Sequence, residues 1–434
     1  MKIKTLSSKR NTLLDLFLIG MFLSYAVLVI SDFTMDGAGI QNLLFGSNLD
    51  TWMDFFSSVQ YTKGAVPYSY FGTVYPPLAN LFFYVIFCWL PSDVKRIIPT
   101  TMYDIMVARG TGADLRTIQS SLMVFFAVLF LTLLGCYVMF RSLLAEERCA
   151  GICALSLIFS YGFLYAIERG NIILLSCALT IFFFRHYRSE RFWLRELAML
   201  ALAAAAGLKL YPAVFGVLYL RERNYKCALR LILYGVLMFI LPAFVFEGID
   251  AITGFIRILG SFTGTGGHVF TYMGLQGISK AAVYWGNQLL GSGSVQWEAL
   301  TGLFGKIQQV SYLLAMVLIV MSLFESQNWR RLLLLTMAML EVQQTTGYTL
   351  CFLTIPLVYC ILEERQLTRR NGVEFFLMLA LILPLPIWGL DIPIYGYPGY
   401  TGKTLCLQLA FAVLTIWLLI RQSMKLTRAY ILKR

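Results

Sequence analysis

The sequence predicts an all-α protein that crosses a membrane many times. Hydrophobic residues make up 59% of the 434 positions, charged residues only 13%, and the mean hydropathy is +0.72. Apolar runs close to the ~20 residues that a membrane helix needs recur along the chain, and most charges fall between them. This pattern excludes a water-soluble fold. We expect one integral membrane domain, 1–434, with roughly ten to twelve membrane segments.

The basic residues predict how the chain is oriented in the membrane. Four of them precede the first apolar segment, Leu13–Ile30, whereas the loop after it, 31–75, carries four aspartates against one lysine. Because loops rich in lysine and arginine stay in the cytoplasm, we expect a cytoplasmic amino terminus and an external loop. Further basic clusters, ending in the tail 421–434, also favour the cytoplasm. The net charge of +12 therefore reflects topology, and we expect a multi-pass plasma-membrane protein that contacts the lipid bilayer and no nucleic acid.

The cysteines and histidines predict neither a disulfide framework nor a metal site. Most of the nine cysteines lie inside apolar runs, there is no Cys-x-x-Cys pair, and the chain has only two histidines. Zinc sites need clustered cysteine and histidine ligands, which this pattern does not offer. We expect no metal and no cofactor.

The apolar runs and the basic loops between them predict the later spans. The stretch 197–220 is interrupted at Lys209 and flanked by basic loops, which predicts a hairpin whose tip points outward. The stretch 247–306 is expected to be a long external loop. The remaining expected spans are Ser120–Phe140, Cys149–Tyr165, Asn171–Phe184, Ala228–Phe246, Gln309–Leu323, Leu332–Glu341, Thr349–Leu362, Phe375–Leu390 and Leu405–Ile420.

One short apolar run, Leu78–Leu90, conflicts with this topology. If it spans the membrane, the span Ser120–Phe140 delivers Arg141 and its basic neighbours to the external side, against the positive-inside rule. Either Leu78–Leu90 is re-entrant, or the loop Ser92–Arg116, which has mixed charges, lies outside for another reason. The sequence leaves both interpretations open.

A polar, turn-rich stretch from Asp50 to Pro77 separates two strongly apolar ones and is where we expect the active site. If it begins as a helix, Asp50 and Asp54 share one face because they are four residues apart. Trp52, Phe55 and Phe56 would then be available to lie against lipid. Two acids would therefore face one small volume.

The end of the same stretch is marked by residues that interrupt helices. Gly64 and Pro67 predict that the first helix stops there. Tyr75 is expected to be extended because a proline follows it. Pro77 is well placed as the first residue of the next helix, where its missing N–H costs nothing.

The spacing of these residues resembles the first external loop of glycosyltransferase family 87, membrane enzymes of the GT-C class. The resemblance implies transfer of a sugar, usually mannose, from a polyprenyl phosphate to a hydroxyl acceptor outside the cytoplasm. It also implies that the first aspartate of the loop is the base. Asp50 occupies that position, but Asp54 falls where members often carry a tyrosine, so either acid remains open, with Asp50 favoured. The residues that carry the resemblance are Asp50, Gly64, Pro67-Tyr68 and Tyr75-Pro76-Pro77-Leu78.

Two further polar elements resemble parts of the same family. Lys209 lies in Leu-Lys-Leu-Tyr-Pro, and its charge at membrane depth costs about 2.5 to 3.5 kcal/mol on insertion scales. Such a lysine is expected either to bind the donor phosphate or to snorkel to the interface. Arg169 in Glu-Arg-Gly-Asn resembles the family's polar turn between two spans. Its guanidinium either binds phosphate through two hydrogen bonds or pairs with Glu168.

Several other residues are expected to line the substrate pocket. They come from the first loop, the turn after Arg169, the element around Lys209, a glycine-rich stretch, and the segment 341–348, which lacks the tryptophan and histidine that family mannosyltransferases tend to carry. We expect aromatic belts at the interface to explain most of the other exposed tyrosines. The expected pocket residues are Asn171, Tyr68, Tyr75, Tyr211, His268 and Gln343.

The sequence therefore predicts an inverting glycosyltransferase that uses a polyprenyl-phosphate sugar and a lipid or glycan acceptor. Asp50 would take the acceptor's proton, and Lys209 with Arg169 would neutralise the donor phosphate in place of a metal. Two alternatives remain. A lipid or solute transporter would place ionisable residues at the midplane of broken helices, and a polysaccharide polymerase or ligase would use a lipid-diphosphate donor.

Overall fold

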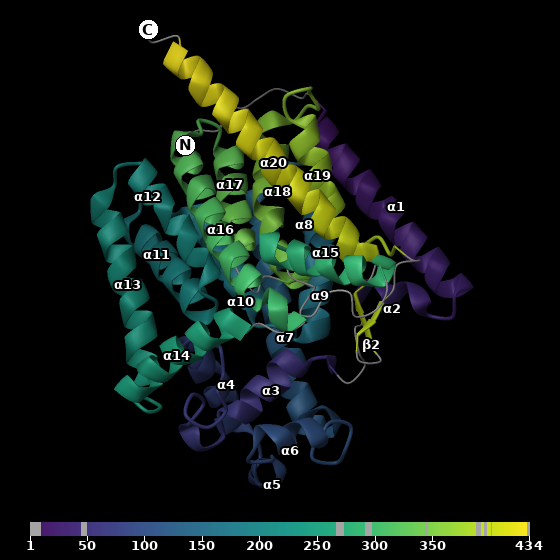
Figure 1. The fold of residues 1–434 in the computed structure, drawn as a ribbon. Helices are drawn as coiled ribbons and strands as arrows, with labels where there is room; N and C mark the ends of the chain where they lie inside the picture. The colour runs from purple at the N-terminus through teal and green to yellow at the C-terminus, as the bar shows by residue number, and fades with distance from the viewer. Residues whose placement is uncertain are drawn as a thin grey trace.

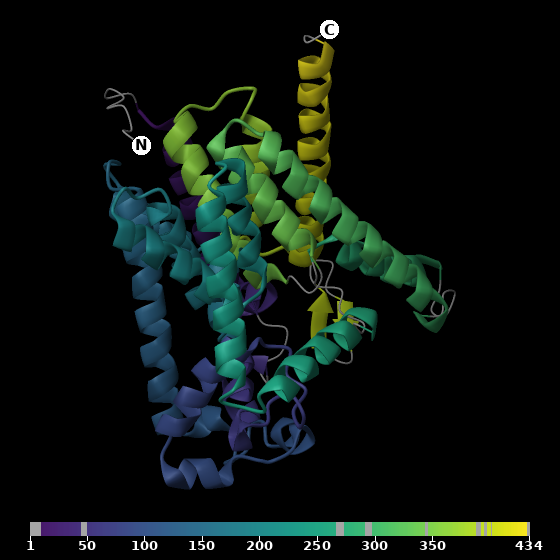
Figure 2. The same ribbon diagram turned by 90° about the vertical axis from the view of Figure 1, so that its left-hand side faces the viewer.

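The computed structural model shows a bundle of long helices with a layer of short helices at one end (Figure 1). It describes residues 10–44, 50–265, 273–290, 297–342, 346–387, 392–394, 397–400 and 402–431. The layer contains α3 (Met53–Tyr61), and we call this end of the molecule the loop end. In both views, the start of α1 (Thr12–Thr34) and the last turns of α20 (Gly402–Ile431) lie at the opposite end, the tail end (Figures 1 and 2).

The predicted all-α membrane fold is confirmed. By length and composition, six segments of the described chain can cross a membrane, and a pair of helices bent by 50°, α8 (Ala150–Ile158) and α9 (Tyr161–Arg169), gives a seventh. Three shorter apolar helices bring the total to ten, within the predicted range. The six are α1, α7 (Gln119–Leu143), α13 (Tyr225–Ala243), most of α16 (Trp297–Phe324), the stretch Gly347–Glu364 and α20; the short ones are α4 (Pro77–Trp89), α10 (Ile173–His186) and α19 (Gly372–Ile382).

The remaining elements are short or connect the membrane helices. A small antiparallel ribbon follows α19, with Ile394 paired to Tyr397, and is a local departure from the all-α prediction. The remaining elements are α2 (Ala38–Leu44), η2 (Lys63–Ala65), α5 (Ser92–Ile97), α6 (Met102–Val107), η3 (Leu115–Thr117), α11 (Phe192–Leu208), η4 (Tyr211–Gly216), α12 (Val217–Arg221), α14 (Ile249–Thr265), α15 (Leu275–Leu290), α17 (Asn328–Glu341), η5 (Gly347–Leu353), α18 (Thr354–Glu364), β1 (Ile392–Ile394) and β2 (Tyr397–Tyr400).

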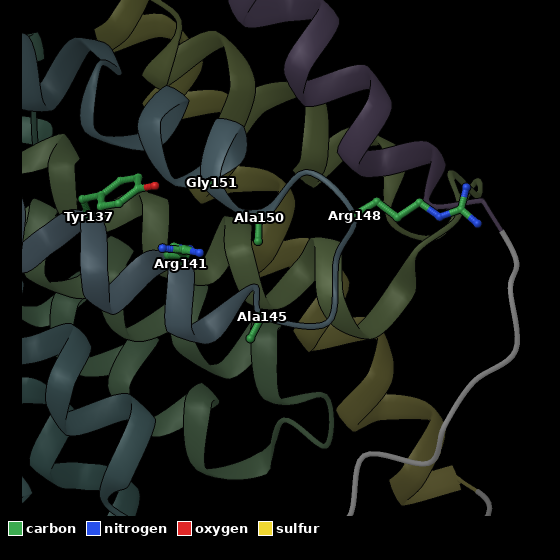
Figure 3. Close-up of a pocket in the computed structure, with 6 residues that line it drawn as sticks. All are labelled: Tyr137, Arg141, Ala145, Arg148, Ala150 and Gly151. Carbon is green, nitrogen blue, oxygen red and sulfur yellow. The ribbon is translucent and has the colours of Figure 1, made fainter.

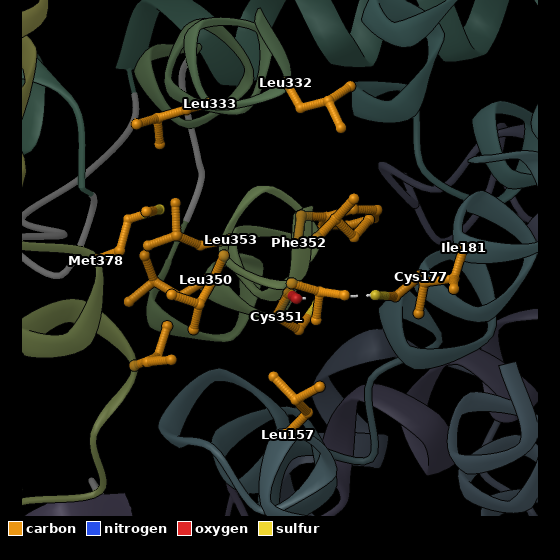
Figure 4. Close-up of a cluster of buried hydrophobic side chains, with 14 of the residues drawn as sticks. Leu157, Cys177, Ile181, Leu332, Leu333, Leu350, Cys351, Phe352, Leu353 and Met378 are labelled. Atoms are coloured by element: carbon orange, nitrogen blue, oxygen red, sulfur yellow. Dashed lines mark hydrogen bonds between the residues drawn. The ribbon is translucent and has the colours of Figure 1, made fainter. Parts of the chain in front are cut away.

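The core of the bundle forms around α17, where every residue from Trp329 to Glu341 is buried. A helix that is buried on all sides must pack against several neighbours at once. Figure 4 shows Leu332 and Leu333 of α17 near the buried residues of η5, and Cys177 of α10 with its thiol 3.9 Å from the Cys351 carbonyl oxygen. This packing fixes η5 against α10 and α17.

The position of α4 resolves the topology conflict in favour of a re-entrant segment. The chain before α4 is bonded to the chain after it: Lys63 donates to the Ile98 carbonyl, and Arg109 lies 2.7 Å from Asp50. Both flanking segments therefore lie at the loop end. With 13 residues, α4 is about 20 Å long, which is shorter than the ~30 Å hydrocarbon core of a bilayer.

Two predictions about the first loop need correction or refinement. The α-helix begins at Met53 rather than at Asp50, because Trp52 adopts a left-handed conformation with φ of 60°. Phe55 and Phe56 do not lie against lipid: they are 4% and 1% exposed and pack on Phe125 of α7. The predicted helix break at Gly64, with φ of 78°, and the helix start at Pro77 are confirmed.

Two other expected boundaries were wrong, and one helix is longer than the span predicted for it. The stretch 247–306 is not a loop, because its described residues form α14, α15 and the start of α16. The span expected over Phe375–Leu390 ends earlier, at Ile382, where the backbone becomes extended at Leu383. The basic residues from Arg421 onward continue α20 as helix to Ile431.

Candidate active site

Two carboxylates and two arginines meet where α3 faces the end of α9. The guanidinium of Arg169 lies 2.6 Å from one oxygen of Asp54 and 3.6 Å from one oxygen of Asp50. Arg109, from the turn after α6, lies 2.7 Å from the other oxygen of Asp50. The structure therefore brings together Asp50, Asp54 and Arg169, as predicted, and adds Arg109.

Asn171 completes the surroundings of Asp54. Its amide nitrogen donates to the second carboxylate oxygen at 2.7 Å, and its own oxygen accepts from the Ile173 N–H at the start of α10. Both oxygens of Asp54 are therefore hydrogen-bonded. Burial alone would raise the pKa of Asp54, but the charge and hydrogen bond of Arg169, with the bond from Asn171, hold that pKa below its ordinary value of 3.8.

Gly170 allows Arg169 and Asn171 to point at the same carboxylate. It ends α9 in the left-handed conformation, with φ of 64°, which glycine adopts without steric cost. A Cβ atom here would lie 3.1 Å from Phe55 Cβ and from Trp52 Cα. The turn and α3 are also joined through their backbones, because the Trp52 N–H donates to the Glu168 carbonyl at 2.7 Å.

The loop 92–116 closes one side of the cluster. Arg116 donates to the Thr51 carbonyl at 3.0 Å and is held 2.6 Å from the buried carboxylate of Asp114. Arg109 reaches the cluster from the same loop. These arginines explain why a loop with basic residues lies at the loop end: they bind the acidic segment directly.

Lys209 lies close enough to Asp54 to interact with its charge, and it forms no ion pair with the described residues. It follows the last residue of α11, is only 9% exposed, and holds its ammonium 4.2 Å from the ring centre of Tyr75 and 5.8 Å from that of Tyr348. Such placement over aromatic faces partly offsets the cost of burying a charge. The structure thus confirms that Lys209 interrupts two helices and puts it near Asp54, whose charge acts on it.

A row of tyrosines leads from Lys209 to a second buried lysine. Tyr348 and Tyr165 have ring centres 6.0 Å apart, and Tyr165 stacks on Tyr161 at 5.9 Å. The ammonium of Lys403, 2% exposed, lies 5.0 Å from the Tyr161 ring and donates to the Leu383 carbonyl at the end of α19. None of Tyr165, Tyr161 and Lys403 was predicted as a site residue.

The other predicted pocket residues take different places. Tyr75 lies under Lys209, and Tyr211 is close enough to Tyr75 and Tyr348 to interact electrostatically with both. Tyr68 is buried against Phe255, and its hydroxyl donates to the Tyr75 carbonyl, so it supports the site rather than lining it. The remaining two, His268 and Gln343, lie outside the described residues.

One cavity lies far from the carboxylates. It measures about 420 Å³ and includes Tyr137, Arg141 and Ala150, where α7 ends and α8 begins (Figure 3). Phe125, which contacts Trp52 and Phe55, is 16 residues earlier on α7 than Arg141, or about 24 Å along the helix. The cavity is therefore at the tail end. Within the described chain, no group of three or more His, Cys, Asp or Glu side chains could hold a metal ion.

The sequence model of glycosyltransferase family 87 matches residues 114–345, which is more than half of the chain. The chain belongs to glycosyltransferase family 87. Membership confirms the family resemblance and makes the protein a glycosyltransferase, and the helices make it a multi-pass membrane member of the family. No curated protein and no solved structure matches it.

The family match includes part of the cluster and excludes the rest. Arg169, Asn171 and Lys209 lie inside the matched residues, whereas Asp50 and Asp54 precede them. The two aspartates are therefore tied to the family region by geometry, through their ion pairs with Arg169.

Arg109 was not predicted as a site residue, although the sequence contains a signal that could have identified it. The loop Ser92–Arg116 has mixed charges, with four basic residues and three acidic ones, and the sequence offers no reason of its own for this loop to lie outside. Arginines outside the cytoplasm are expected to have acidic partners, and the loop 31–75 contains four aspartates that can pair with them. Lys403 and Tyr165 have no comparable signal in the sequence, because only the tertiary fold brings them into one row with Tyr161 and Tyr348.

Proposed function

We propose that this glycosyltransferase moves mannose from a polyprenyl phosphate to a hydroxyl group of a lipid or glycan acceptor, with inversion of the anomeric centre. The observation that carries the proposal is that two neighbouring carboxylates, near the ammonium group of Lys209, are hydrogen-bonded to different extents. Asp54 uses both oxygens in short hydrogen bonds, while Asp50 is held closely at one oxygen only. The sugar itself follows from the family resemblance.

Asp50 is the better candidate for the base. Its side chain is 41% exposed against 19% for Asp54, and one of its oxygens has no closer cation than Arg169 at 3.6 Å. A base needs a lone pair that can face the acceptor hydroxyl. Asp54 instead holds Arg169 and Asn171 in position, so we assign it a positioning role.

Arg169 and Lys209 supply positive charge for the donor phosphate. The side chains of Asp50, Asp54, Arg109, Arg169 and Lys209 carry three positive and two negative charges, and the carboxyl group of Glu168 also interacts with Arg169. Lys209 forms no ion pair among the described residues, so we assign it, with Arg169, to the incoming phosphate. A fixed cation near a leaving phosphate stabilises the charge that develops as the bond to the sugar breaks.

The reaction then proceeds in one displacement. Asp50 accepts the proton of the acceptor hydroxyl while that oxygen forms a bond to the anomeric carbon. The bond between the anomeric carbon and the phosphate oxygen breaks, and its electron pair leaves with the polyprenyl phosphate. Because attack and departure occur on opposite faces, the anomeric configuration inverts.

The active site is proposed to face the outside of the plasma membrane. The cluster lies at the loop end, opposite the basic last turns of α20 (Figure 1). The positive-inside rule favours the cytoplasm for that basic tail and for the amino terminus, which places α3 outside. Polyprenyl-linked sugars are donors that can act on that side, where nucleotide sugars are scarce.

A donor panel tests the proposal. Purified protein in lipid nanodiscs is given radiolabelled mannose on polyprenyl phosphate, arabinofuranose on polyprenyl phosphate, mannose on polyprenyl diphosphate, or a nucleotide sugar, with a lipid extract as acceptor pool. We expect a labelled lipid or glycan product only with the monophosphate mannose donor. Transfer from the diphosphate donor would support the polymerase or ligase alternative, and transfer of arabinose alone would overturn the assignment of the sugar.

A further inference from the structure

The cavity at the tail end, between the end of α7 and the start of α8, is lined by arginines that have no acidic partner in the described chain. Arg141 and Arg148 are both exposed, and neither forms an ion pair or a side-chain hydrogen bond with the described residues. The buried acid of the connecting turn, Glu147, lies 3.0 Å from Arg365. The other acid of that turn, Glu146, is exposed and does not line the cavity.

We propose that this cavity binds the phosphate group of an anionic phospholipid of the surrounding membrane. It measures about 420 Å³, the liquid volume of roughly 14 waters at about 30 Å³ each, which leaves room for a phosphate and a glycerol group. Arginine matches phosphate well, because its planar guanidinium can donate two parallel hydrogen bonds to phosphate oxygens. The sugar-transfer mechanism uses no residue of this cavity, so the inference goes beyond the proposed function.

Arg141 is the residue that we assign to the phosphate. It lies one helical turn after Tyr137 on the same face of α7, and the hydroxyl of Tyr137 forms no hydrogen bond with the described residues. Figure 3 shows the Arg148 side chain directed away from Arg141, so we assign Arg148 to the edge of the cavity. Gly151 leaves space beside the phenol, because a Cβ atom there would lie 3.3 Å from the Tyr137 hydroxyl oxygen.

Exposed apolar side chains continue from the cavity into the membrane, which favours a lipid over a free phosphate ion. On α7, Val138 and Leu134 lie about one and two turns before Arg141, and on α8, Ile152 and Leu155 lie in the first two turns; all four are exposed. Since α7 arrives at the tail end and α8 leaves it, both rows run from the cavity toward the middle of the membrane. A lipid whose phosphate is held by Arg141 can lay its acyl chains on these two rows.

A photoreactive phosphatidylglycerol tests the assignment. The probe carries a diazirine close to the glycerol end of one acyl chain and is illuminated with the full-length protein in nanodiscs of phosphatidylcholine. We expect labelled peptides from the end of α7 and from α8. Replacing part of the host lipid by unlabelled phosphatidylglycerol should remove this label, whereas replacing it by phosphatidylethanolamine, or adding inorganic phosphate, should not.

Two substitutions at exposed positions of the cavity sharpen the test. Arg141→Gln removes the charge and Ala145→Trp fills the space, and each is expected to lower labelling at least five-fold with an unchanged melting temperature. Arg148→Gln is expected to lower labelling about two-fold. Arg428→Gln is the matched control and should label like wild type, because Arg428 is an exposed arginine at the same end that has no ion pair in the described chain and does not line the cavity.

Four results would overturn the inference: labelling confined to other helices, equal competition by phosphatidylethanolamine, equal competition by inorganic phosphate, or unchanged labelling in a folded Arg141→Gln or Ala145→Trp variant. The second would mean that the cavity holds bulk lipid, and the third that it holds a free anion. If both variants melt early, the competition result with wild type decides. The readout involves no sugar, so the inference and the proposed function can fail independently.

Discussion

Arg169 joins both carboxylates of the first loop, 2.6 Å from Asp54 and 3.6 Å from Asp50. One side chain from the end of α9 therefore links the two acids of the first loop to the region matched by the family. Replacing Arg169 by lysine therefore tests whether binding of the donor phosphate needs the shape of the arginine side chain or only its positive charge.

Arg169→Lys is expected to lower sugar transfer by roughly 100-fold, as loss of one donor to a developing charge does in other enzymes. A lysine keeps the charge but cannot reach two acids and a phosphate with a planar fork. Initial rates with saturating donor, beside wild type, measure the effect. Arg96→Lys is the control, since Arg96 lies exposed on α5 and has no ion pair among the described residues. A variant as fast as wild type would remove Arg169 from the site.

Gly170→Ala is expected to destabilise the protein by about 1 to 3 kcal/mol, because alanine would have to keep a left-handed conformation and its Cβ would press on Phe55 and Trp52. The melting temperature in nanodiscs should fall. Gly135→Ala on α7 is the comparison, because a Cβ there meets no atom within 4 Å. Equal melting temperatures for the two variants would contradict the described turn.

The lowered pKa of Asp54 predicts how stability depends on pH. Asp54 is ionised more readily when folded than when unfolded, so its contribution is complete above its unfolded pKa and is lost as the pH falls through the lower, folded value. Between pH 5 and 8 Asp54 should not titrate. Below pH 4, wild type should lose stability more steeply than Asp54→Asn, as thermal melts over a pH series can show. Parallel curves would argue against the ion pair with Arg169.

Glu374→Gln tests a different part of the molecule. Glu374 is 0% exposed, and one of its oxygens lies 3.2 Å from Arg330 and 2.6 Å from Arg421. Removing the acid leaves two arginines without this partner and should cost about 3 to 5 kcal/mol. These residues join α17, α19 and α20 away from the carboxylate cluster, so transfer per folded molecule should stay normal. A drop in specific activity without a drop in melting temperature would contradict a structural role.

Composition and local pattern were enough to predict the membrane fold and much of the cluster. The acids of the first loop, Arg169 and Lys209 are all charged residues in or beside apolar segments. A charge in such a place is costly and usually has a function. The backbone preferences of Pro77 and Gly64 predict a helix start at Pro77 and a helix break at Gly64.

Features that depend on packing could not be predicted in the same way. Phe55 and Phe56 have the same hydrophobicity whether they face lipid or protein, and only the approach of Phe125 decides between the two. The helices within 247–306 were missed because amphipathic helices at an interface carry too many polar residues to resemble spans. Lys403 reaches the site through Tyr161, which is 242 positions earlier in the chain.

The central claim is that Asp50 is the base and Asp54 a positioning residue. The most direct measurement compares donor binding and sugar transfer in wild type, Asp50→Asn and Asp54→Asn, with the exposed acid variant Asp93→Asn as control. We expect Asp50→Asn to bind polyprenyl-phosphate mannose normally and transfer none of it, while Asp54→Asn binds the donor more weakly but keeps measurable transfer. Normal transfer by Asp50→Asn, or complete loss in Asp54→Asn with intact donor binding, would contradict the assignment.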